Sequence, residues 1–416
     1  MPRLVHVIGA GLAGLAAAVR LQRRGVQVAL HEAAGQAGGR CRSWYDRTLA
    51  ATLDSGNHVV LAGHAETLAY VRAIGAADAL TGPEEPGFAF MDLAARSRWS
   101  VRFSRSRLPL WIADANARVP DTRLTDYLAV LPLLFAKPGR SIGQIMPCVG
   151  PLWDRLLRPL YLAALNVDPR DASAELAGAM LREALTIGGE AFRPLTARNG
   201  LSSAFVDPAL RMLQHGGAAI RLESPLNEIA YDDAARRAVA LDFDSGQVLL
   251  GADEAVVLAV PAAAAAALVP GLQTPQRHTA IATLHFAVEP PPGLATPMVL
   301  VNGTANWLSA SAGRLVATIH DAGALLQLAP DELARRVWAD VAAATSLPVE
   351  PLPAWQIVSD TQAVFAAEPQ EELRRPAART RWNNVTLAGD WTATGLPATI
   401  EGAICSGRKA ADLLLS

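Results

Sequence analysis

The stretch that decides the fold is residues 3–14, RLVHVIGAGLAG, in which a run of mostly aliphatic residues leads into three glycines. An Ala- and Leu-rich segment follows to about Arg24, so strand, glycine turn and helix come in the order of a dinucleotide-binding unit. Gly9 permits the tight turn, Gly11 lets the backbone approach a pyrophosphate, and Gly14 lets the helix pack against the strand.

The start of the helix and the end of the next strand complete this unit. Leu12 and Ala13 stand at the helix N-terminus, whose unpaired N–H groups and positive dipole attract phosphates. Residues 26–31 form the predicted second strand, and Glu32 follows it, 18 residues beyond Gly14. This is close to the ~20 residues expected for the acid that accepts hydrogen bonds from an adenosine ribose, and a glutamate there disfavours NADP. We therefore expect a Rossmann-like α/β domain that binds an adenine dinucleotide other than NADP.

Composition excludes several classes of protein. The chain has 416 residues, is 51% hydrophobic and carries a formal charge of −2, which argues against a disordered chain and against nucleic-acid binding. Its length suggests two or three domains. The three cysteines form no C-x-x-C, so we expect neither a metal site nor a disulfide framework.

The N-terminal sequence, the cysteines and the hydropathy predict the cellular location. The strand-like run begins within three residues of Met1 and leaves no room for a signal peptide, which together with the cysteines predicts a cytoplasmic protein. Mean hydropathy is high, at +0.20. Even so, the longest apolar run, residues 255–269, is broken by Pro261 and is shorter than the ~18 residues of a membrane span.

A second motif identifies the dinucleotide. Glu32, five residues, and then Gly38, Gly39 and Arg40 resemble the second FAD signature of the amine oxidase and phytoene desaturase superfamily. In that superfamily the glycine pair and the arginine contact the FAD pyrophosphate, since two amides and a guanidinium can reach the same anion. The resemblance implies FAD as cofactor, and it places the backbone near Leu226 beside the adenine.

The C-terminal segment is the most specific part of the sequence. A predicted strand ends in Gly389 and Asp390, and the aspartate is suited to accept hydrogen bonds from ribityl hydroxyls or to lie near the pyrophosphate; a simple helix cap is the alternative. Residues 396–415 read as a helix with Pro397 at an early position. Its first turn, with Pro397, Ala398 and Thr399, is expected to meet the flavin at O2 and N1, where reduced flavin carries negative charge.

Three stretches point to a narrower family. Residues 388–403, AGDWTATGLPATIEGA, resemble the signature of the squalene-associated FAD-dependent desaturase-like proteins, the hydroxysqualene dehydroxylases. Residues 54–61 and 159–174 also resemble segments of that family, although Ser55 and Asn57 depart from its commoner residues. The resemblance implies reductive removal of the hydroxyl of hydroxysqualene to give squalene in bacterial squalene and hopanoid biosynthesis. It implies an apolar C30 isoprenoid substrate and an electron donor for FAD that the sequence does not name.

Two insertions separate the FAD motifs. Residues 65–197 are predicted to be mostly helical, whereas residues 280–381 combine strands at 281–288, 298–301 and 315–319 with a helix from about Pro330. We expect a discontinuous FAD-binding domain and one inserted, mixed α+β substrate domain. The predicted FAD-binding domain comprises residues 1–64, 198–279 and 382–416, and the substrate domain comprises residues 65–197 and 280–381.

An apolar stretch within the first insertion has two interpretations. Residues 127–136, YLAVLPLLFA, are too short to span a bilayer but are suited to peripheral membrane contact or to the wall of an apolar tunnel. A buried helix explains the same pattern equally well.

The implied reaction needs one proton donor in an apolar pocket, because an allylic hydroxyl leaves as water once it is protonated. The candidates are Asp54 and His58, with Asn166 and Glu401 behind them. Each has a structural alternative: a loop cap for Asp54, a core histidine for His58, and hydrogen bonds to cofactor or loops for Glu401.

Three other functions remain to be weighed. A phytoene-type desaturase has the same fold with electrons flowing from substrate into FAD. Amine oxidases of the superfamily usually hold a lysine on the strand that is here residues 281–288, yet Lys137 and Lys409 are the only lysines of this chain. A non-enzymatic prenyl-binding module is disfavoured because the phosphate-side motifs are intact.

Overall fold

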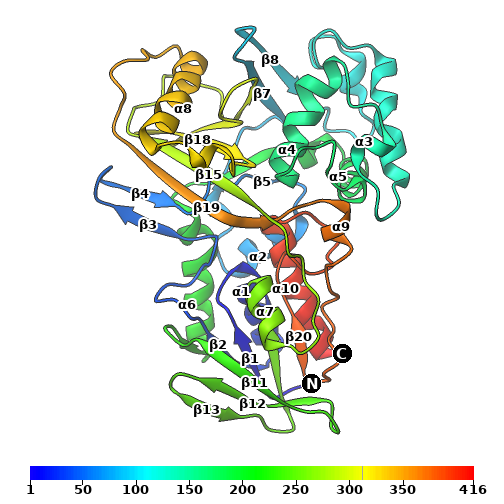
Figure 1. The fold of residues 1–416 in the computed structure, drawn as a ribbon, viewed down its shortest axis with the longest axis vertical. Coiled ribbons are helices and arrows are strands. Elements are labelled where there is room, and N and C mark those ends of the chain that lie inside the picture. Colours follow the sequence, from blue (N-terminus) through cyan, green and yellow to red (C-terminus); the bar gives the residue numbers. More distant parts are fainter. Residues whose placement is uncertain (312) are drawn as a thin grey trace.

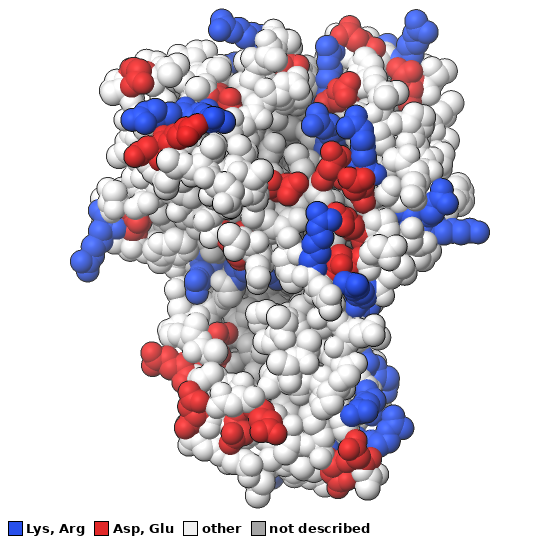
Figure 2. Space-filling model, in the orientation of Figure 1, with Lys and Arg blue, Asp and Glu red and all other residues white. Residues whose placement is uncertain are grey.

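The computed structural model describes residues 1–311 and 313–416, arranged as two halves along the long axis of the molecule (Figure 1). One half holds both chain termini and a parallel sheet, and the other holds a larger mixed sheet and a helical lobe. Figure 2 shows the molecule narrowing where the two halves meet.

The parallel sheet confirms the predicted Rossmann-like fold. Its five strands pair in the order β10-β2-β1-β14-β20, and all pairs are parallel. They come from three separate stretches of the chain, although the domain boundaries themselves stay a prediction. The strands are β1 (Leu4–Ile8), β2 (Gln27–His31), β10 (Ala219–Arg221), β14 (Glu254–Leu258) and β20 (Val385–Leu387).

Helices α1 (Leu12–Gln22) and α10 (Ile400–Leu415) pack closely beside this sheet because small residues face one another. A Cβ at Gly407 of α10 would lie 2.0 Å from the carbonyl oxygen of Ala13. Helix α2 (Ala65–Ala73) belongs to the same core, where buried Tyr70 donates to the carbonyl of Phe205 at 2.8 Å. The first helix of the predicted substrate domain therefore packs with the dinucleotide-binding core.

A small antiparallel sheet covers the outer end of this half. It contains β11 (Leu226–Asp232), β12 (Arg237–Phe243) and β13 (Gly246–Leu249), which confirms the hairpin expected from the turn at residues 244–247. Phe243 stacks on His31 of β2 with ring centroids 4.5 Å apart, which fixes the small sheet against the parallel one.

The other half is built on a seven-stranded sheet of order β19-β15-β18-β17-β16-β7-β8. Three of its strands were predicted, but the hairpin β7–β8 lies in the stretch expected to be mostly helical, and that expectation is wrong there. β7 pairs in parallel with β16, some 200 residues away, and is buried there. Its local sequence therefore gives little indication of a strand. The strands are β7 (Gly87–Asp92), β8 (Ser97–Arg102), β15 (His278–Phe286), β16 (Met298–Val301), β17 (Trp307–Ser311), β18 (Arg314–His320) and β19 (Trp355–Phe365).

The two faces of this sheet differ in chemistry. Side chains alternate along a strand, so Leu284 and Phe286 of β15 point to one face and Thr283 and His285 to the other. Helix α8 (Pro330–Thr345) covers the apolar face with buried Leu333, Val337 and Val341, as its sequence spacing predicts. The opposite, polar face is turned toward the glycine-rich half of the molecule.

The C-terminal helix begins later than predicted. The expected start at residue 396 is wrong, because α10 begins at Ile400 with Thr399 as its N-cap, whose Oγ1 accepts from the Gly402 amide at 3.2 Å. Pro397 lies outside the helix. Thr394 Oγ1 accepts from the Leu396 amide at 3.1 Å, and this turn keeps residues 394–396 from continuing the helix.

The helical lobe and the short connecting elements complete the chain. No helix among the described residues has the length and apolar character needed to cross a membrane. The lobe contains η2 (Leu110–Ala113), η3 (Leu124–Phe135), α3 (Ile142–Ile145), η4 (Trp153–Leu157), α4 (Arg158–Leu165) and α5 (Ala174–Ile187). The remaining elements are β3 (Ser43–Asp46), β4 (Ala51–Asp54), β5 (Val60–Leu61), η1 (Ala77–Ala79), β6 (Leu80–Thr81), η5 (Gly189–Phe192), β9 (Pro194–Ala197), η6 (Ser202–Val206), α6 (Asp207–His215), α7 (Ala262–Leu268), η7 (Leu325–Gln327) and α9 (Pro369–Glu372).

Candidate cofactor and substrate site

The glycine turn after β1 contains glycines of two kinds. A Cβ at Gly14 would lie 1.9 Å from the Gly9 carbonyl oxygen, and one at Gly9 would lie 2.5 Å from the Ala259 carbonyl oxygen, so the protein's own backbone requires both glycines. At Gly11 a Cβ would meet no atom within 4 Å, and the backbone has an ordinary φ of −70°. The fold of the protein therefore does not require a glycine at position 11. This fits a space beside Gly11 that is reserved for a bound group.

The second glycine pair lies directly beside this turn. The Gly38 amide donates to the Ala10 carbonyl at 2.8 Å, and a Cβ at Gly39 would lie 3.4 Å from the Gly11 Cα. Gly38 and Gly39 both have positive φ, +113° and +55°. Two glycine segments from different parts of the sequence thus surround the start of α1, where Leu12 and Ala13 stand, and this cradle fits a pyrophosphate.

Glu32 stands at the carboxyl end of β2, as expected. Its Oε2 accepts from the Ala10 amide at 2.7 Å and its Oε1 from the Ala34 amide at 2.9 Å, so the carboxylate is fixed beside the glycine turn. Each oxygen retains a lone pair that can accept from a ribose hydroxyl. Leu226 opens β11 with a half-buried side chain. The contacts of Glu32 and Leu226 with FAD stay predictions.

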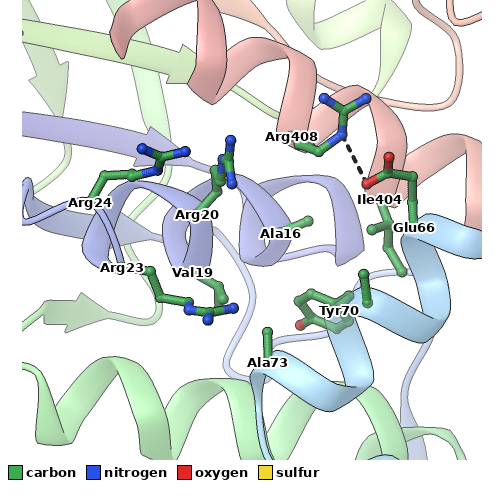
Figure 3. Close-up of a pocket in the computed structure, with 11 residues that line it drawn as sticks. Ala16, Val19, Arg20, Arg23, Arg24, Glu66, Tyr70, Ala73, Ile404 and Arg408 are labelled. Atoms are coloured by element: carbon green, nitrogen blue, oxygen red, sulfur yellow. Dashed lines mark ion pairs between the residues drawn. The ribbon is translucent and has the colours of Figure 1, made fainter.

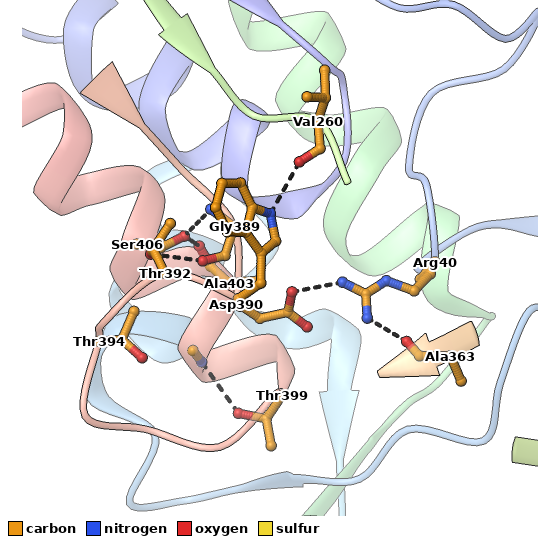
Figure 4. A network of polar contacts seen from close by, with 12 residues as sticks. Arg40, Val260, Ala363, Gly389, Asp390, Thr392, Thr394, Thr399, Ala403 and Ser406 are labelled. Carbon is orange, nitrogen blue, oxygen red and sulfur yellow. Dashed lines mark hydrogen bonds and ion pairs between the residues drawn. The ribbon is translucent and has the colours of Figure 1, made fainter. Parts of the chain in front are cut away.

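Arg40 links the glycine half to the substrate half (Figure 4). Its Nη2 donates to Asp390 Oδ1 at 2.7 Å, and its Nη1 donates to the Ala363 carbonyl of β19. Asp390 raises the pKa of this guanidinium above its ordinary value, against the opposing effect of burial. The Asp390 carboxylate therefore holds the arginine, and its second oxygen remains available to a ligand.

The segment around Asp390 is fixed by its neighbours (Figure 4). The Gly389 amide donates to Ser406 Oγ of α10 at 2.8 Å, and Trp391 Nε1 donates to the Val260 carbonyl at 3.0 Å. A Cβ at Gly389 would lie 2.2 Å from that indole nitrogen. Gly389 thus allows the chain to turn tightly between β20 and the N-terminus of α10, where Pro397, Ala398 and Thr399 lie.

Three of the four predicted catalytic residues accept hydrogen bonds from backbone amides and so have a structural role. Asp54 Oδ1 accepts from the Leu201 amide at 2.9 Å and from the Ser43 hydroxyl. Glu401 accepts from the amides of Glu66 and Thr67 at 3.0 and 2.8 Å, at the N-terminus of α2.

Asn166 is the third of these residues. It is 3% exposed and ends α4 in the left-handed conformation, with φ of 55°. Its Nδ2 donates to Thr279 Oγ1 at 2.6 Å, and its Oδ1 accepts from the Asp321 amide at 2.9 Å. Asn166 therefore fastens the helical lobe to the seven-stranded sheet.

His58 alone of the four keeps a ring nitrogen without a partner among the described residues, and it lies near the junction of the two halves. Its Nε2 lies 3.2 Å from the Arg40 carbonyl oxygen, and burial lowers its pKa. The preceding Asn57 donates to Ser309 Oγ at 3.0 Å on the polar face of the sheet.

The polar sheet face carries residues that sequence reasoning missed. Both ring nitrogens of His285, Nδ1 of His320, and Nε and Nη1 of Arg314 are buried without a hydrogen-bond partner among the described residues. Burial is the largest cause that lowers the pKa of His285 and of His320 to about 4, and it also lowers the pKa of Arg314. Unpartnered polar atoms are costly in a core, and their clustering on one face fits a site for a ligand.

Burial also perturbs a titratable group that the sequence did not single out. Burial, and then the charge of Glu401, raise the pKa of Glu183 on α5 to about 7. A carboxyl with such a pKa is partly protonated at neutral pH and is able to donate a proton. Only the tertiary fold brings α5 near the start of α10, so no local pattern marks Glu183.

A cavity of about 330 Å³ lies elsewhere, between α1, α2 and α10 (Figure 3). Arg20, Arg23, Arg24 and Arg408 line it, and Arg408 pairs with Glu66 at 2.8 Å. Its lining along α1 runs from Ala16 to Arg24, so it begins about 8 Å along the helix from Gly11. This cavity is therefore separate from the glycine cradle.

Comparison with known proteins identifies the relatives of this fold. Residues 12–289 and 293–415 match the family described as flavin containing amine oxidoreductase. The structure is similar to that of cyclohexylamine oxidase from Brevibacterium oxydans IH-35A, with a TM-score of 0.68 and 16% identity, covering 100% of this chain and 99% of that one. At this identity the likeness concerns the fold alone.

Closer relatives share the whole length of the chain. The sequence is 48% identical to hydroxysqualene dehydroxylase of Rhodopseudomonas palustris (strain ATCC BAA-98 / CGA009), covering 100% of this chain and 99% of that protein. It is 40% identical to hydroxysqualene dehydroxylase of Zymomonas mobilis subsp. mobilis (strain ATCC 31821 / ZM4 / CP4), covering 99% of each chain.

Proposed function

The chain belongs to the flavin containing amine oxidoreductase family and, within it, to the hydroxysqualene dehydroxylases, and on that premise we propose that it converts hydroxysqualene to squalene with FAD as cofactor. The observation that carries this proposal is the full-length identity of 48% to a protein of that activity. The cradle around Gly11, which its own fold leaves empty, fits the cofactor.

The residues proposed to hold FAD lie around the start of α1 and the start of α10. Reduced FAD supplies a hydride. The proposed contacts are Gly9, Gly11, Leu12, Ala13, Gly14, Glu32, Gly38, Gly39, Arg40, Leu226, Gly389, Asp390, Pro397, Ala398 and Thr399.

The protein's own task is to make the hydroxyl leave. The C–O bond of the allylic alcohol breaks when a proton reaches its oxygen, water departs with the bonding electrons, and a hydride then forms the new C–H bond. The balance is one proton, one hydride and hydroxysqualene in, and squalene and water out. The protein must therefore donate one proton at the hydroxyl and keep other water away from the allylic cation.

We propose His58 and His320 as the groups that hydrogen-bond the substrate hydroxyl. The low pKa of His320 reflects burial first and a contribution from His58, which is consistent with the two rings lying near each other. His58 is also the proposed donor of the proton, since it is one of the two first candidates that the sequence offers. Asp54, Asn166 and Glu401 are proposed as positioning residues, since their oxygens hold backbone amides.

The substrate is an apolar C30 isoprenoid, which dissolves in a bilayer rather than in water. We therefore propose peripheral contact with the inner face of the cytoplasmic membrane through residues 127–136, and an electron donor that reduces FAD.

Product analysis tests the function directly. Anaerobic enzyme with a flavin-reducing system and hydroxysqualene is expected to yield squalene, and enzyme without the reductant to yield none. A phytoene-type desaturase is the alternative, and it would bleach oxidised flavin on mixing with phytoene. Unchanged hydroxysqualene together with flavin bleached by phytoene would overturn the proposal.

A further inference from the structure

Large apolar side chains are exposed on the helical lobe to an unusual degree. Phe135 is 82% exposed and Leu128 is 60% exposed, both on η3, although Tyr127 and Leu133 of the same segment are buried. The lobe as a whole presents seven such side chains within 42 residues, which we call the apolar ridge: Leu108, Leu110, Leu124, Leu128, Leu131, Phe135 and Val149.

The segments that carry the ridge are neighbours in space. η3 contacts both η2 and α3, so the side chains of Leu110, of η3 and of the loop after α3 lie on adjoining elements. Figure 1 shows this lobe at the end of the molecule opposite the parallel sheet. Exposed apolar side chains on adjoining elements mark an interaction surface rather than scattered surface residues.

Charge indicates what kind of surface covers the ridge. Residues 102–158, which carry the ridge, contain nine Lys and Arg and four Asp, whereas the rest of the lobe, residues 159–187, contains two Arg and four acidic residues. Arg107, Arg123, Lys137 and Arg140 are exposed within residues 102–158. One of the four aspartates, Asp121, is ion-paired with Arg155. In the view of Figure 2 the outer side of the lobe is largely white, and both blue and red side chains lie at its margin.

We propose that the apolar ridge and its basic margin form a docking surface for a bilayer containing anionic phospholipids. Leu and Phe side chains enter the boundary between headgroups and acyl chains, while lysine and arginine side chains at the margin meet anionic headgroups. This deepens the proposed peripheral membrane contact: it adds η2 and the loop after α3 to residues 127–136, and it specifies the charge of the lipid.

Vesicle flotation tests the apolar part. The holoenzyme is expected to float with vesicles of phosphatidylglycerol and phosphatidylcholine at least ~10-fold more than with phosphatidylcholine alone. The double variant Leu128→Ser/Phe135→Ser is expected to lose binding to both. The control Leu249→Ser removes a side chain that is 75% exposed on β13, in the other half of the molecule, and is expected to float like the parent protein.

Charge reversal tests the basic margin. Lys137→Glu/Arg140→Glu is expected to abolish the preference for phosphatidylglycerol, whereas Arg23→Glu/Arg24→Glu, two adjacent exposed arginines at the end of α1, is expected to leave it unchanged. Raising salt from 0.15 M to 0.5 M is expected to weaken the preference, since anionic headgroups are screened.

Three results would overturn the docking surface. The first is that the parent protein does not float with vesicles, and the second is that the ridge variant floats as well as its control. The third is that the parent protein is a dimer and the ridge variant a monomer, since a second copy of the chain would then cover the apolar ridge. Turnover of detergent-dispersed hydroxysqualene separates this inference from the function. The ridge variant is expected to turn over hydroxysqualene like the parent protein. If the parent protein itself shows no turnover, the proposed function is contradicted, but the vesicle result still supports the docking surface.

Discussion

The glycine cradle and the polar face of the seven-stranded sheet meet at one site, yet they are built by opposite rules. In the cradle the polar side chains have partners, as Glu32 and the Arg40–Asp390 pair show, so the backbone amides at the start of α1 are the groups left for a cofactor. On the sheet face His285, His320 and Arg314 bury polar atoms that have none among the described residues. The cradle is thus complete without a substrate, whereas the sheet face carries a local cost in stability that a bound ligand would relieve.

The largest expected effect separates the two kinds of glycine in the cradle. Gly14→Ala places a Cβ 1.9 Å from a backbone oxygen, so we expect a loss of more than about 3 kcal/mol in the free energy of unfolding and little bound flavin. Gly11→Ala meets no atom, so we expect a change in stability of the apoprotein below about 1 kcal/mol and yet loss of FAD. Denaturant unfolding and the flavin absorbance check both; a Gly11→Ala protein with full FAD would contradict the cradle.

The second effect concerns the ion pair that joins the two halves. Arg40→Ala leaves the buried Asp390 carboxylate without its cation, and we expect a loss of about 1–3 kcal/mol, reduced from a fully buried pair because the Arg40 side chain is 50% exposed. Arg408→Ala is the matched control, because both side chains of the Arg408–Glu66 ion pair are about one third exposed. Its expected loss in the free energy of unfolding is below about 1 kcal/mol. Urea unfolding of both variants compares them, and equal losses would remove the special role of Arg40.

The sequence predicts the glycine cradle well and the polar sheet face poorly. Glycine spacing revealed the cradle because phosphates are bound by backbone amides, which require glycines at fixed offsets from one strand and one helix. His285 stands on a predicted strand and His320 directly follows another, but their shared face depends on the pairing of β15 with β18, which no local pattern reports. The late start of α10 was missed because Thr399 caps the helix and Pro397 does not begin it.

The third prediction uses pH to probe the sheet face. The pKa of His285 is lowered to about 4 from about 6.5 when unfolded, so the folded protein binds fewer protons and loses stability as pH falls from about 6.5 to 4. We expect His285→Asn to remove about 2 kcal/mol of that loss. Thermal unfolding between pH 7.5 and 4.5 measures it, with His215→Asn on the exposed end of α6 as control; parallel pH profiles for His285→Asn and the parent would contradict it.

The smallest expected effect on stability has the opposite sign. Arg314→Met replaces unpartnered polar atoms by an apolar chain of similar length, and we expect stability to stay the same or to rise by about 1 kcal/mol, with FAD content unchanged. Turnover is expected to fall at least ~10-fold, since the unpartnered guanidinium atoms are then no longer there for the substrate. Thermal unfolding and steady-state kinetics check the two parts, and a destabilisation as large as that of Arg40→Ala would show that Arg314 is a structural residue.

The central claim is that the sheet face acts on substrate while the cradle holds the cofactor. It is tested most directly by single-turnover reoxidation of photoreduced enzyme by hydroxysqualene, comparing the parent protein with His320→Asn at equal FAD content. We expect one FAD per chain in both proteins and a rate at least ~10-fold lower in the variant, with squalene as product. An unchanged rate in His320→Asn, or a lower rate that merely follows lost FAD, would contradict it.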